Sequence, residues 1–267
     1  MTDHTSAPTI RADVPPPVVT AAPREVADGV YVIPDGRVPL VPNIGIILGD
    51  RSALVVDTGF GPHSGANTHT AVKALAGDRE LMVTLTHFHP EHGFGAQAFT
   101  DATLLYNRVQ HEEFRQKAAG YLEQFRGFSE DAAHELEEVE FVDPQIVYDE
   151  ECDIDLGGRL VQMRFRGPAH SRGDQAIFLP AERILFTGDL VEARFLPIFP
   201  YFPPYDVDVD GHRWVAVLDD LKGLEPAIVV SGHGEIGGIE LIDAYHTYIP
   251  VAAIRNASAI GRGQAPG

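Results

Sequence analysis

Apolar residues, many of them β-branched, occur in short runs bounded by glycine and polar residues, which is the pattern of β-strands. The runs span residues 30–33, 44–48, 53–56, 81–85, 160–166, 175–179, 183–187 and 227–230. Gly49-Asp50, between the second and third runs, predicts a hairpin turn, because Gly and Asp tolerate the positive φ that such a turn requires. The strands fall into two groups, one in each half of the chain.

Longer segments with helical character lie between and after these strands. They span residues 62–76, 108–138, 211–222 and about 237–257. Pro62 suits the first turn of the first helix and Gly77 its end, while Ser129 is placed as an N-cap with acidic residues behind it. We interpret the segment of about 108–140 as a helical insertion, which is either a solubilising helix pair or a lid.

The first 25 residues differ from the rest in composition. Five prolines lie between Pro8 and Pro23, with no apolar core of a signal peptide. We expect a flexible Pro/Ala-rich tail over residues 1–25 and one folded domain over residues 26–267. Since no apolar run reaches the roughly 20 residues of a membrane span, we also expect a cytoplasmic protein without membrane contact.

Charge narrows the set of partners. The chain has 20 Lys and Arg against 39 Asp and Glu, a net charge of -19, which argues against a nucleic-acid partner. Fifteen of the acids lie within residues 111–155, which we interpret as solvated surface. Cys152 is the single cysteine, so no internal disulfide forms, and a reducing compartment fits. Its acidic, turn-like surroundings raise its pKa and predict an inert thiol.

The most informative stretch directly follows the apolar run at 81–85. Thr86-His87-Phe88-His89-Pro90-Glu91-His92 holds three imidazoles and one carboxylate, which are ligands that first-row divalent metals prefer. A turn at Pro90 directs His87 and His89 to one metal, and Glu91 with His92 to a neighbouring one. The alternative is a solvated, histidine-rich loop.

Three later segments place a metal-binding residue beside glycine, just past an apolar run. They are Gly167-Pro168-Ala169-His170, Phe186-Thr187-Gly188-Asp189 and Val229-Val230-Ser231-Gly232-His233-Gly234. Glycine allows a tight turn at the end of a strand, where ligands converge at one edge of a sheet. Taken singly, these residues fit loop histidines and a turn or cap aspartate; taken with residues 87–92, they form a set.

This set resembles the metallo-β-lactamase superfamily. The signature of that superfamily is His-x-His-x-Asp-His, a histidine after a glycine-containing turn, a Gly-Asp, and a Gly-His-Gly near the end. The positions that match this signature are, in order, residues 87–92, His170, Asp189 and His233. They are preceded by Val55-Val56-Asp57-Thr58-Gly59, which is similar to a strand motif found early in members of the superfamily. The resemblance covers about residues 26–245. It implies a mixed α/β (α+β), single-domain fold, a four-layer αββα sandwich with its metal site at one edge.

The resemblance also implies a ligand set. His87, His89 and His170 bind the first metal, Glu91, His92 and His233 bind the second, and Asp189 bridges both. Asp57 accepts a hydrogen bond that orients one ligand, or else is a turn carboxylate. Two Zn²⁺ per chain are expected, with iron and manganese as alternatives.

Position 91 departs from the family pattern, because it is Glu where the family has Asp. The extra methylene moves the carboxylate by more than an ångström, roughly one carbon–carbon bond. Zinc–oxygen distances tolerate only about ±0.2 Å, so the loop adjusts or the second site weakens. A single-metal enzyme, with Glu91 as the proton carrier, stays open.

The expected reaction is hydrolysis. A metal-bound hydroxide cleaves an ester, thioester, lactone or amide bond of a small, partly apolar substrate, and Asp189 or Glu91 relays the proton. An aromatic and proline-rich segment at 195–206, followed by Trp214, is predicted to wall a substrate pocket or to form a homodimer contact or a packed loop.

Other classes are kept as alternatives. Hydroxyacylglutathione hydrolases are disfavoured among them, because they carry a helical C-terminal extension and only 34 residues follow His233 here. Hydrolysis of β-lactams is a second possibility, although no export signal is visible. A mononuclear iron oxidoreductase similar to persulfide dioxygenases would use the same kinds of ligand, and a binding protein without activity would keep the fold alone.

Overall fold

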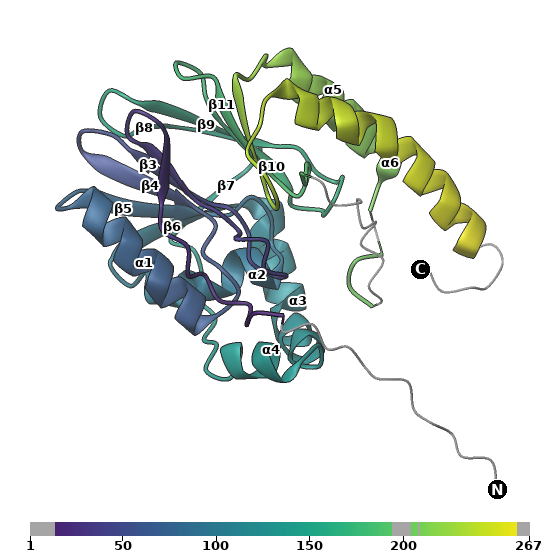
Figure 1. The fold of residues 1–267 in the computed structure, drawn as a ribbon, viewed down its shortest axis with the longest axis horizontal. Coiled ribbons are helices and arrows are strands. Elements are labelled where there is room, and N and C mark those ends of the chain that lie inside the picture. Colours follow the sequence, from purple (N-terminus) through teal and green to yellow (C-terminus); the bar gives the residue numbers. More distant parts are fainter. Residues whose placement is uncertain (1–13, 194–203, 208, 261–267) are drawn as a thin grey trace, which may run out of the picture.

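Two β-sheets lie face to face in this computed structural model, and helices cover the outer face of each sheet (Figure 1). The structure describes residues 14–193, 204–207 and 209–260. The layers run helix, sheet, sheet, helix. This confirms the α/β (α+β) sandwich of αββα type that the sequence predicts.

The first sheet has seven strands in the order β1-β2-β3-β4-β5-β6-β7. Their bounds are β1 Arg24–Ala27, β2 Val30–Ile33, β3 Ile44–Leu48, β4 Ser52–Val56, β5 Glu80–Thr84, β6 Ala102–Asn107 and β7 Ile146–Tyr148. Strands β1 to β4 pair antiparallel, and β4 to β7 pair parallel. The carboxyl ends of β4 and β5 therefore lie side by side, and Asp57 and the 86–92 segment follow them.

The second sheet has five strands in the order β12-β11-β10-β9-β8. Their bounds are β8 Glu151–Asp155, β9 Leu160–Phe165, β10 Gln175–Leu179, β11 Ile184–Gly188 and β12 Ile228–Ser231. Strands β11 and β12 pair parallel, whereas β8 to β11 pair antiparallel. Asp189 and His233 thus leave neighbouring strand ends.

Helices occupy both outer layers. Their bounds are α1 Pro62–Ala76, α2 Pro90–Gly93, the 3₁₀ helix η1 Phe94–Ala98, α3 Arg108–Arg126, α4 Glu130–Glu135, α5 Gly211–Gly223 and α6 Ile239–Ile260. Ser129 caps α4 as predicted, since its Oγ accepts a hydrogen bond from Ala132 N at 3.0 Å. Within the described ranges, no helix has both the length and the apolar character needed to cross a membrane.

Three apolar clusters fill the interfaces between the four layers. Residues of β4 show the principle: Ala53 and Val55 pack toward α1 and α3, while Leu54 and Val56 pack toward the second sheet. Alternate residues of a strand point to opposite faces, so a strand buried on both faces is a continuous apolar run. The third cluster lies between the second sheet and helices α5 and α6.

Close contacts fix the spacing of the two sheets. Gly45 of β3 faces the ring of Phe186 on β11, and a Cβ at position 45 would lie 2.5 Å from that ring. Both residues lie within the layer between the sheets, where protein interiors are packed at the density of organic crystals. The sheets therefore approach here as closely as a glycine allows.

Four strands have no counterpart among the predicted runs: β1, β6, β7 and β8. In β8, exposed acids alternate with the half-buried Cys152 and Ile154, so its apolar signal is weak. The prediction that Cys152 lies in a turn is therefore wrong. Its raised pKa is confirmed, because burial and the neighbouring Asp153 both disfavour the thiolate.

The predicted flexible tail is folded in part. Residues 1–13 lie outside the described residues, but Val19 is buried against α1 and β1 begins at Arg24. Asn67 Nδ2 donates to Val19 O at 2.9 Å, and Val19 N donates to Ser64 Oγ at 3.2 Å. One apolar side chain and two polar residues of α1 thus hold a segment whose prolines led us to expect disorder.

The predicted hairpin between β3 and β4 forms for a different reason. Gly49 N donates to Ser52 O at 2.9 Å, yet neither Gly49 nor Asp50 has a positive φ. The glycine is needed for space instead, because a Cβ at position 49 would lie 2.2 Å from Leu156 O. The turn packs directly on the loop that joins β8 to β9.

We expect Gly49→Ala to lower the free energy of unfolding by about 1 to 3 kcal/mol, the usual cost of overpacking. Urea denaturation of purified protein measures this change. Gly223→Ala is the matched control, because nothing lies within 4 Å of its added Cβ. Equal stability of the two variants would contradict the close contact at Leu156.

Candidate metal centre

The predicted ligands lie where strands end, at one edge of the two sheets. His87 and His89 follow β5, while Glu91 and His92 lie on the one-turn helix α2. The remaining three residues come from the second sheet: His170 between β9 and β10, Asp189 after β11 and His233 after β12. Each of the seven residues is at most 9% exposed.

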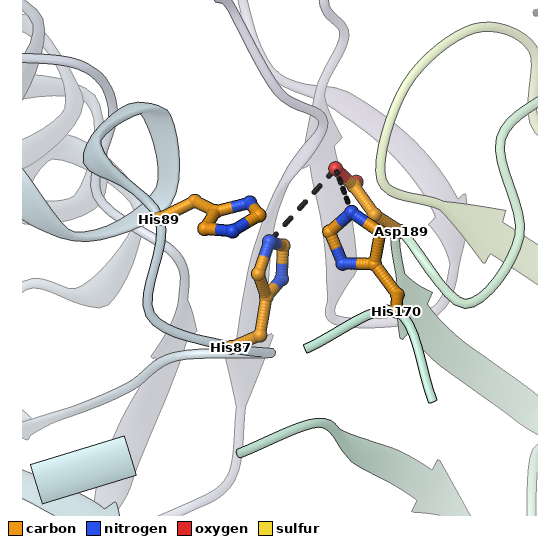
Figure 2. A group of neighbouring side chains, drawn as sticks. All are labelled: His87, His89, His170 and Asp189. Carbon is orange, nitrogen blue, oxygen red and sulfur yellow. Dashed lines mark ion pairs between the residues drawn. The ribbon is translucent and has the colours of Figure 1, made fainter. Parts of the chain in front are cut away.

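The structure brings all seven residues together in two groups that share Asp189. The first group is His87, His89, His170 and Asp189, and the second is Glu91, His92, Asp189 and His233. Within each group, the atoms able to bind a metal lie within 4.8 Å of one another. Figure 2 shows the first group, with His87 and His170 both directed at the carboxylate.

The two oxygens of Asp189 face different groups. Oδ2 lies 3.9 Å from Nε2 of His87 and 3.9 Å from Nε2 of His170. Oδ1 lies 3.4 Å from Nε2 of His92 and 3.8 Å from Nε2 of His233. One carboxylate thus lies between two histidine groups, as a bridging ligand requires.

Six buried atoms of the centre make no hydrogen bond within the described part of the chain. They are His87 Nε2, His89 Nε2, Glu91 Oε2, His92 Nε2, His170 Nδ1 and Asp189 Oδ1. A buried polar atom without a partner costs about 1 to 3 kcal/mol. Imidazole nitrogen and carboxylate oxygen are preferred ligands of Zn²⁺ and similar ions, so the donor set fits two metals.

In two of the histidines, the opposite ring nitrogen is held by a protein acceptor. His87 Nδ1 donates to Thr86 Oγ1 at 3.1 Å, and His233 Nδ1 donates to Val41 O at 3.0 Å. Such bonds fix the tautomer, because the nitrogen that carries the proton cannot bind a metal. Both rings therefore present Nε2 to the centre.

Asp57 lies where the resemblance to the superfamily predicts. It accepts a hydrogen bond from His92 Nδ1 at 3.0 Å and others from the backbone and hydroxyl of Thr86. Its own φ of 68° is in the left-handed region, which Asp tolerates better than most residues. It therefore orients His92 and also holds the start of the histidine segment.

The electrostatics of the centre keep Asp189 ionised. Although burial alone would raise the pKa of Asp189, the neighbouring His92 and His233 hold it well below its ordinary value. Burial, together with His92 and His89, lowers the pKa of His87 well below its usual range, so this imidazole stays neutral as a ligand must.

Glycines leave room for the shared carboxylate. A Cβ on Gly232 would lie 1.9 Å from Asp189 Oδ1. Gly188, directly before Asp189, has a φ of 51°, and a Cβ there would lie 2.4 Å from Thr86. The glycines that drew attention in the sequence thus allow the two sheets to meet at this edge.

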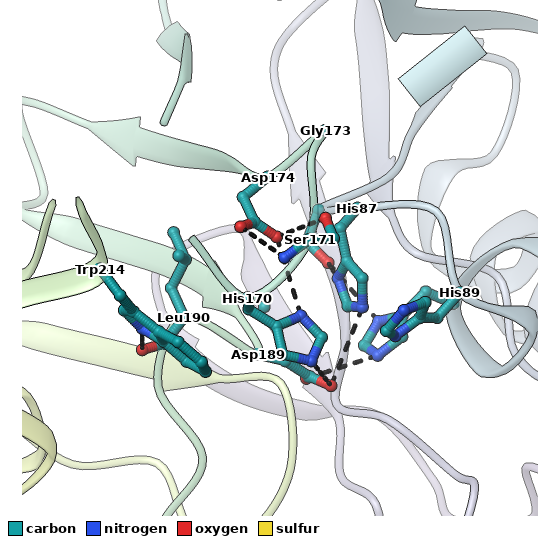
Figure 3. A network of polar contacts seen from close by, with 12 residues as sticks. His87, His89, His170, Ser171, Gly173, Asp174, Asp189, Leu190 and Trp214 are labelled. Carbon is teal, nitrogen blue, oxygen red and sulfur yellow. Dashed lines mark hydrogen bonds and ion pairs between the residues drawn. The ribbon is translucent and has the colours of Figure 1, made fainter. Parts of the chain in front are cut away.

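Support for the His170 loop comes from residues whose supporting role the sequence analysis missed. Asp174 accepts hydrogen bonds from Ser171 N at 2.8 Å and Ser171 Oγ at 2.6 Å, which closes the loop, and its Oδ1 lies 3.7 Å from His170 Nδ1 (Figure 3). Trp214 packs against His170 at a ring distance of 5.5 Å and donates to Leu190 O. The spacing of His170 and Asp174 was the one signal available for this support.

The sequence analysis placed Trp214 near a possible pocket wall. The structure buries it instead, at 1% exposure, in the apolar cluster between α5, α6 and the second sheet. Of the aromatic and proline-rich segment, residues 195–203 lie outside the described residues.

Helix α3 is neither a lid nor a solubilising helix, because one of its faces is buried beneath the centre. Gln110 Nε2 donates to Leu85 O at 2.9 Å and to Thr86 O at 3.1 Å. Glu113 is fully buried and accepts a hydrogen bond from Gly173 N at 2.8 Å. The prediction of a solvated acidic surface over residues 111–155 is therefore wrong at this helix. Through these hydrogen bonds, α3 connects the His87 segment to the His170 loop.

The loop that carries His233 is held from the first sheet. Asn43 Nδ2 donates to Ser231 O at 2.9 Å and to Gly234 O at 3.0 Å, and Asp35 accepts from Gly234 N. Single polar residues in a loop give no sequence signal for such a role, so both were missed.

A metal-binding αββα sandwich with two donor groups at its edge defines the class of this protein. The family model described as the metallo-beta-lactamase superfamily matches residues 37–233. The chain belongs to this superfamily.

Curated relatives and solved structures agree with that membership. The chain is 26% identical over 231 residues to acyl-coenzyme A thioesterase MBLAC2 of Bos taurus, covering 79% of this chain and 80% of the relative. Its identity to the Gallus gallus protein of the same name is 27% over 235 residues, covering 79% of each. A metallo-beta-lactamase from Pontibacter korlensis has the same fold, with a TM-score of 0.67, 15% identity, and coverage of 86% of this chain and 99% of that one. Family and relatives together support a hydrolase.

The shared carboxylate predicts how metal content responds to substitution. Wild-type protein loaded with Zn²⁺ and dialysed should hold about two ions per chain. His87→Ala and His233→Ala should each lose about one ion, from different groups, whereas Asp189→Ala should lose both. Elemental analysis of the three variants measures this. Equal loss in all three would contradict two groups joined by Asp189.

Metal affinity should rise with pH. In the metal-free chain, Asp174 and Asp189 outweigh burial and raise the pKa of His170 to about 9, and Asp189 and Asp57 raise the pKa of His92. Below those pKa values a metal must displace the protons, so the apparent Kd should fall as pH rises from about 6 to 9. Titration with Zn²⁺ in weak buffer should also show proton release. A Kd independent of pH would contradict these assignments.

Proposed function

We propose that this protein is a dinuclear zinc hydrolase that cleaves acyl thioesters, with related esters, lactones and amides as further candidate substrates. The observation that carries the proposal is the position of the Asp189 carboxylate between two groups of candidate ligands. Each of its two oxygens faces two histidines of a different group. A thioester is favoured because the relatives MBLAC2 are named acyl-coenzyme A thioesterases.

Held by these two groups, metal ions would supply Lewis acidity and would lower the pKa of a water toward neutrality. The side chains of the two groups determine where that chemistry would take place. Asp189 stays ionised and holds the two groups at a fixed separation, because its pKa is depressed by His92 and His233. Glu91 Oε2 is buried without a hydrogen-bond partner in the described chain, so this oxygen would bind the second metal or, with one metal bound, would carry a proton toward the leaving group.

The substitution of Glu for Asp at position 91 is compatible with two metals. Glu91 lies in the second group, with a ligand atom within 4.8 Å of those of His92, Asp189 and His233. It follows Pro90 in the first turn of α2, and His89 is the N-cap of that helix. The one-turn helix thus directs the longer side chain into the second group.

An iron oxidoreductase with one metal is the second candidate, and the second donor group argues against it. One iron would use the first group and leave Glu91, His92 and His233 together without a metal. Hydrolysis of β-lactams rests on likeness to enzymes such as the DIM-1 metallo-beta-lactamase, at 17% identity and a TM-score of 0.68, which establishes the fold alone.

A substrate panel tests the proposal. Zinc-loaded protein is assayed with acyl-coenzyme A thioesters of increasing chain length, aryl esters, lactones and a chromogenic cephalosporin, and oxygen uptake is followed with a persulfide. We expect the highest kcat/KM with a thioester, loss of activity on chelation, and recovery with Zn²⁺. Oxygen uptake with one bound iron, or turnover of the cephalosporin alone, would reject the thioesterase.

Two variants at position 91 test the role of Glu91 in the same assays. Glu91→Asp should keep or raise activity, because it restores the family ligand, whereas Glu91→Gln should lower kcat by about 10²- to 10⁴-fold if the residue carries a proton. Asp149→Asn is the control, since its side chain is 74% exposed and pairs with Arg108.

A further inference from the structure

Four polar side chains form a buried network beside the first donor group. Glu113, Lys117 and Tyr121 come from α3, and Asp206 comes from the segment before α5. Lys117 Nζ lies 2.5 Å from Glu113 Oε1 and 3.3 Å from Asp206 Oδ1, while Tyr121 OH donates to the same Asp206 oxygen. All four residues are at most 6% exposed. The metal chemistry described above uses none of them.

The second oxygen of Asp206 is directed at a candidate metal ligand. Oδ2 lies 3.5 Å from Nε2 of His89, and both side chains are buried. Asp206 is in neither donor group, so it lies behind His89 rather than among the ligands. At this distance the two atoms form an ion pair but no hydrogen bond within the described part of the chain, so Asp206 Oδ2 faces His89 Nε2 less closely than the acceptors of His92 and His233 face their ring nitrogens.

Packing against α3 fixes the position of Asp206. The neighbouring Tyr205 lies on Gly120, where a Cβ would be 1.6 Å from the tyrosine hydroxyl. The rings of Tyr205 and Tyr121 are 5.1 Å apart. A glycine in the middle of a helix costs roughly 0.5 to 1 kcal/mol relative to alanine, so its presence here points to a packing requirement.

Charge explains why a buried carboxylate is tolerated at this place. Lys117 forms ion pairs with both Asp206 and Glu113, which leaves the three groups with one net negative charge beside His89. A buried charge is expensive unless it is paired and hydrogen-bonded, and Lys117 and Tyr121 together meet that condition for Asp206 Oδ1. The oxygen that faces His89 is the one left to accept a further hydrogen bond.

We propose that Asp206 is a positioning residue for His89. It accepts the proton of Nε2–H, so that the ring offers its other nitrogen to the first metal, and the Lys117–Tyr121–Gly120 face of α3 holds Asp206 in place. The inference rests on the metal centre proposed above, but not on which bond the enzyme cleaves.

The test measures metal binding and the His89 ring instead of turnover. Asp206→Ala should weaken the first Zn²⁺ by about 10- to 100-fold in chelator competition, the usual cost of losing such a carboxylate. Asp206→Asn, which keeps an acceptor oxygen, should lose less. In the metal-free chain, ¹⁵N spectra of the His89 ring should show the Nε2–H tautomer in wild type and a mixture in Asp206→Ala.

A second variant leaves the network's polar groups intact. Gly120→Ala should displace Tyr205 and with it Asp206, and should weaken the first Zn²⁺ in the same direction. Gly223→Ala is its control, because the added Cβ meets nothing within 4 Å and should leave the affinity unchanged. Circular dichroism confirms that each variant is folded.

The outcomes separate this inference from the proposed function. Unchanged Zn²⁺ affinity and an unchanged ring tautomer in folded Asp206→Ala and Gly120→Ala would overturn the inference. Loss of a whole metal ion with an unchanged tautomer would make Asp206 a ligand and would overturn it too. A chain that binds two Zn²⁺ in the predicted way but hydrolyses no thioester would reject the proposed function and support the role of Asp206.

Discussion

The carboxylate of Asp189, with one oxygen toward each histidine group, is the constraint around which this edge of the molecule is built. Its oxygens lie 3.4 to 3.9 Å from four different imidazoles that come from both sheets. The surrounding backbone makes room for it, since a Cβ on Gly232 would collide with Asp189 and one on Gly188 would collide with Thr86. The histidines around Asp189 and the glycines beside it therefore meet the same requirement, which is to place one shared carboxylate between two buried donor groups.

Orientation of the rings is distributed over many elements. Each histidine ring has a partner behind it: a threonine, an aspartate, a backbone carbonyl or the carboxylate at the end of the α3 network. Because these partners come from different strands and loops, no single loop determines the geometry. Such support from rigid elements is what holds a metal site to the sub-ångström tolerance that coordination demands.

The sequence predicted which candidate ligands lie together because these residues follow a local rule. It missed the residues that support them because those supports depend on tertiary packing. His87, Asp189 and His233 each follow a buried apolar run, and such runs are visible without a structure. Glu113 and Lys117 are spaced four apart on a helix, as in any surface ion pair, and only packing against the loop of Gly173 shows that they are buried. Cys152 and Val19 were misplaced similarly, since composition alone does not reveal an edge strand or an anchored tail.

The contact between Gly45 and Phe186 has a consequence for the whole molecule. It sets how far apart the two sheets stand, and the donor atoms are contributed by one sheet and the other. The apolar layer between the sheets thus helps to set the distances between the donor atoms at its edge, although none of the candidate ligands belongs to that layer. A bulkier side chain in that layer would push the two sheets apart. It would thereby change the distances between donor atoms with which it makes no contact.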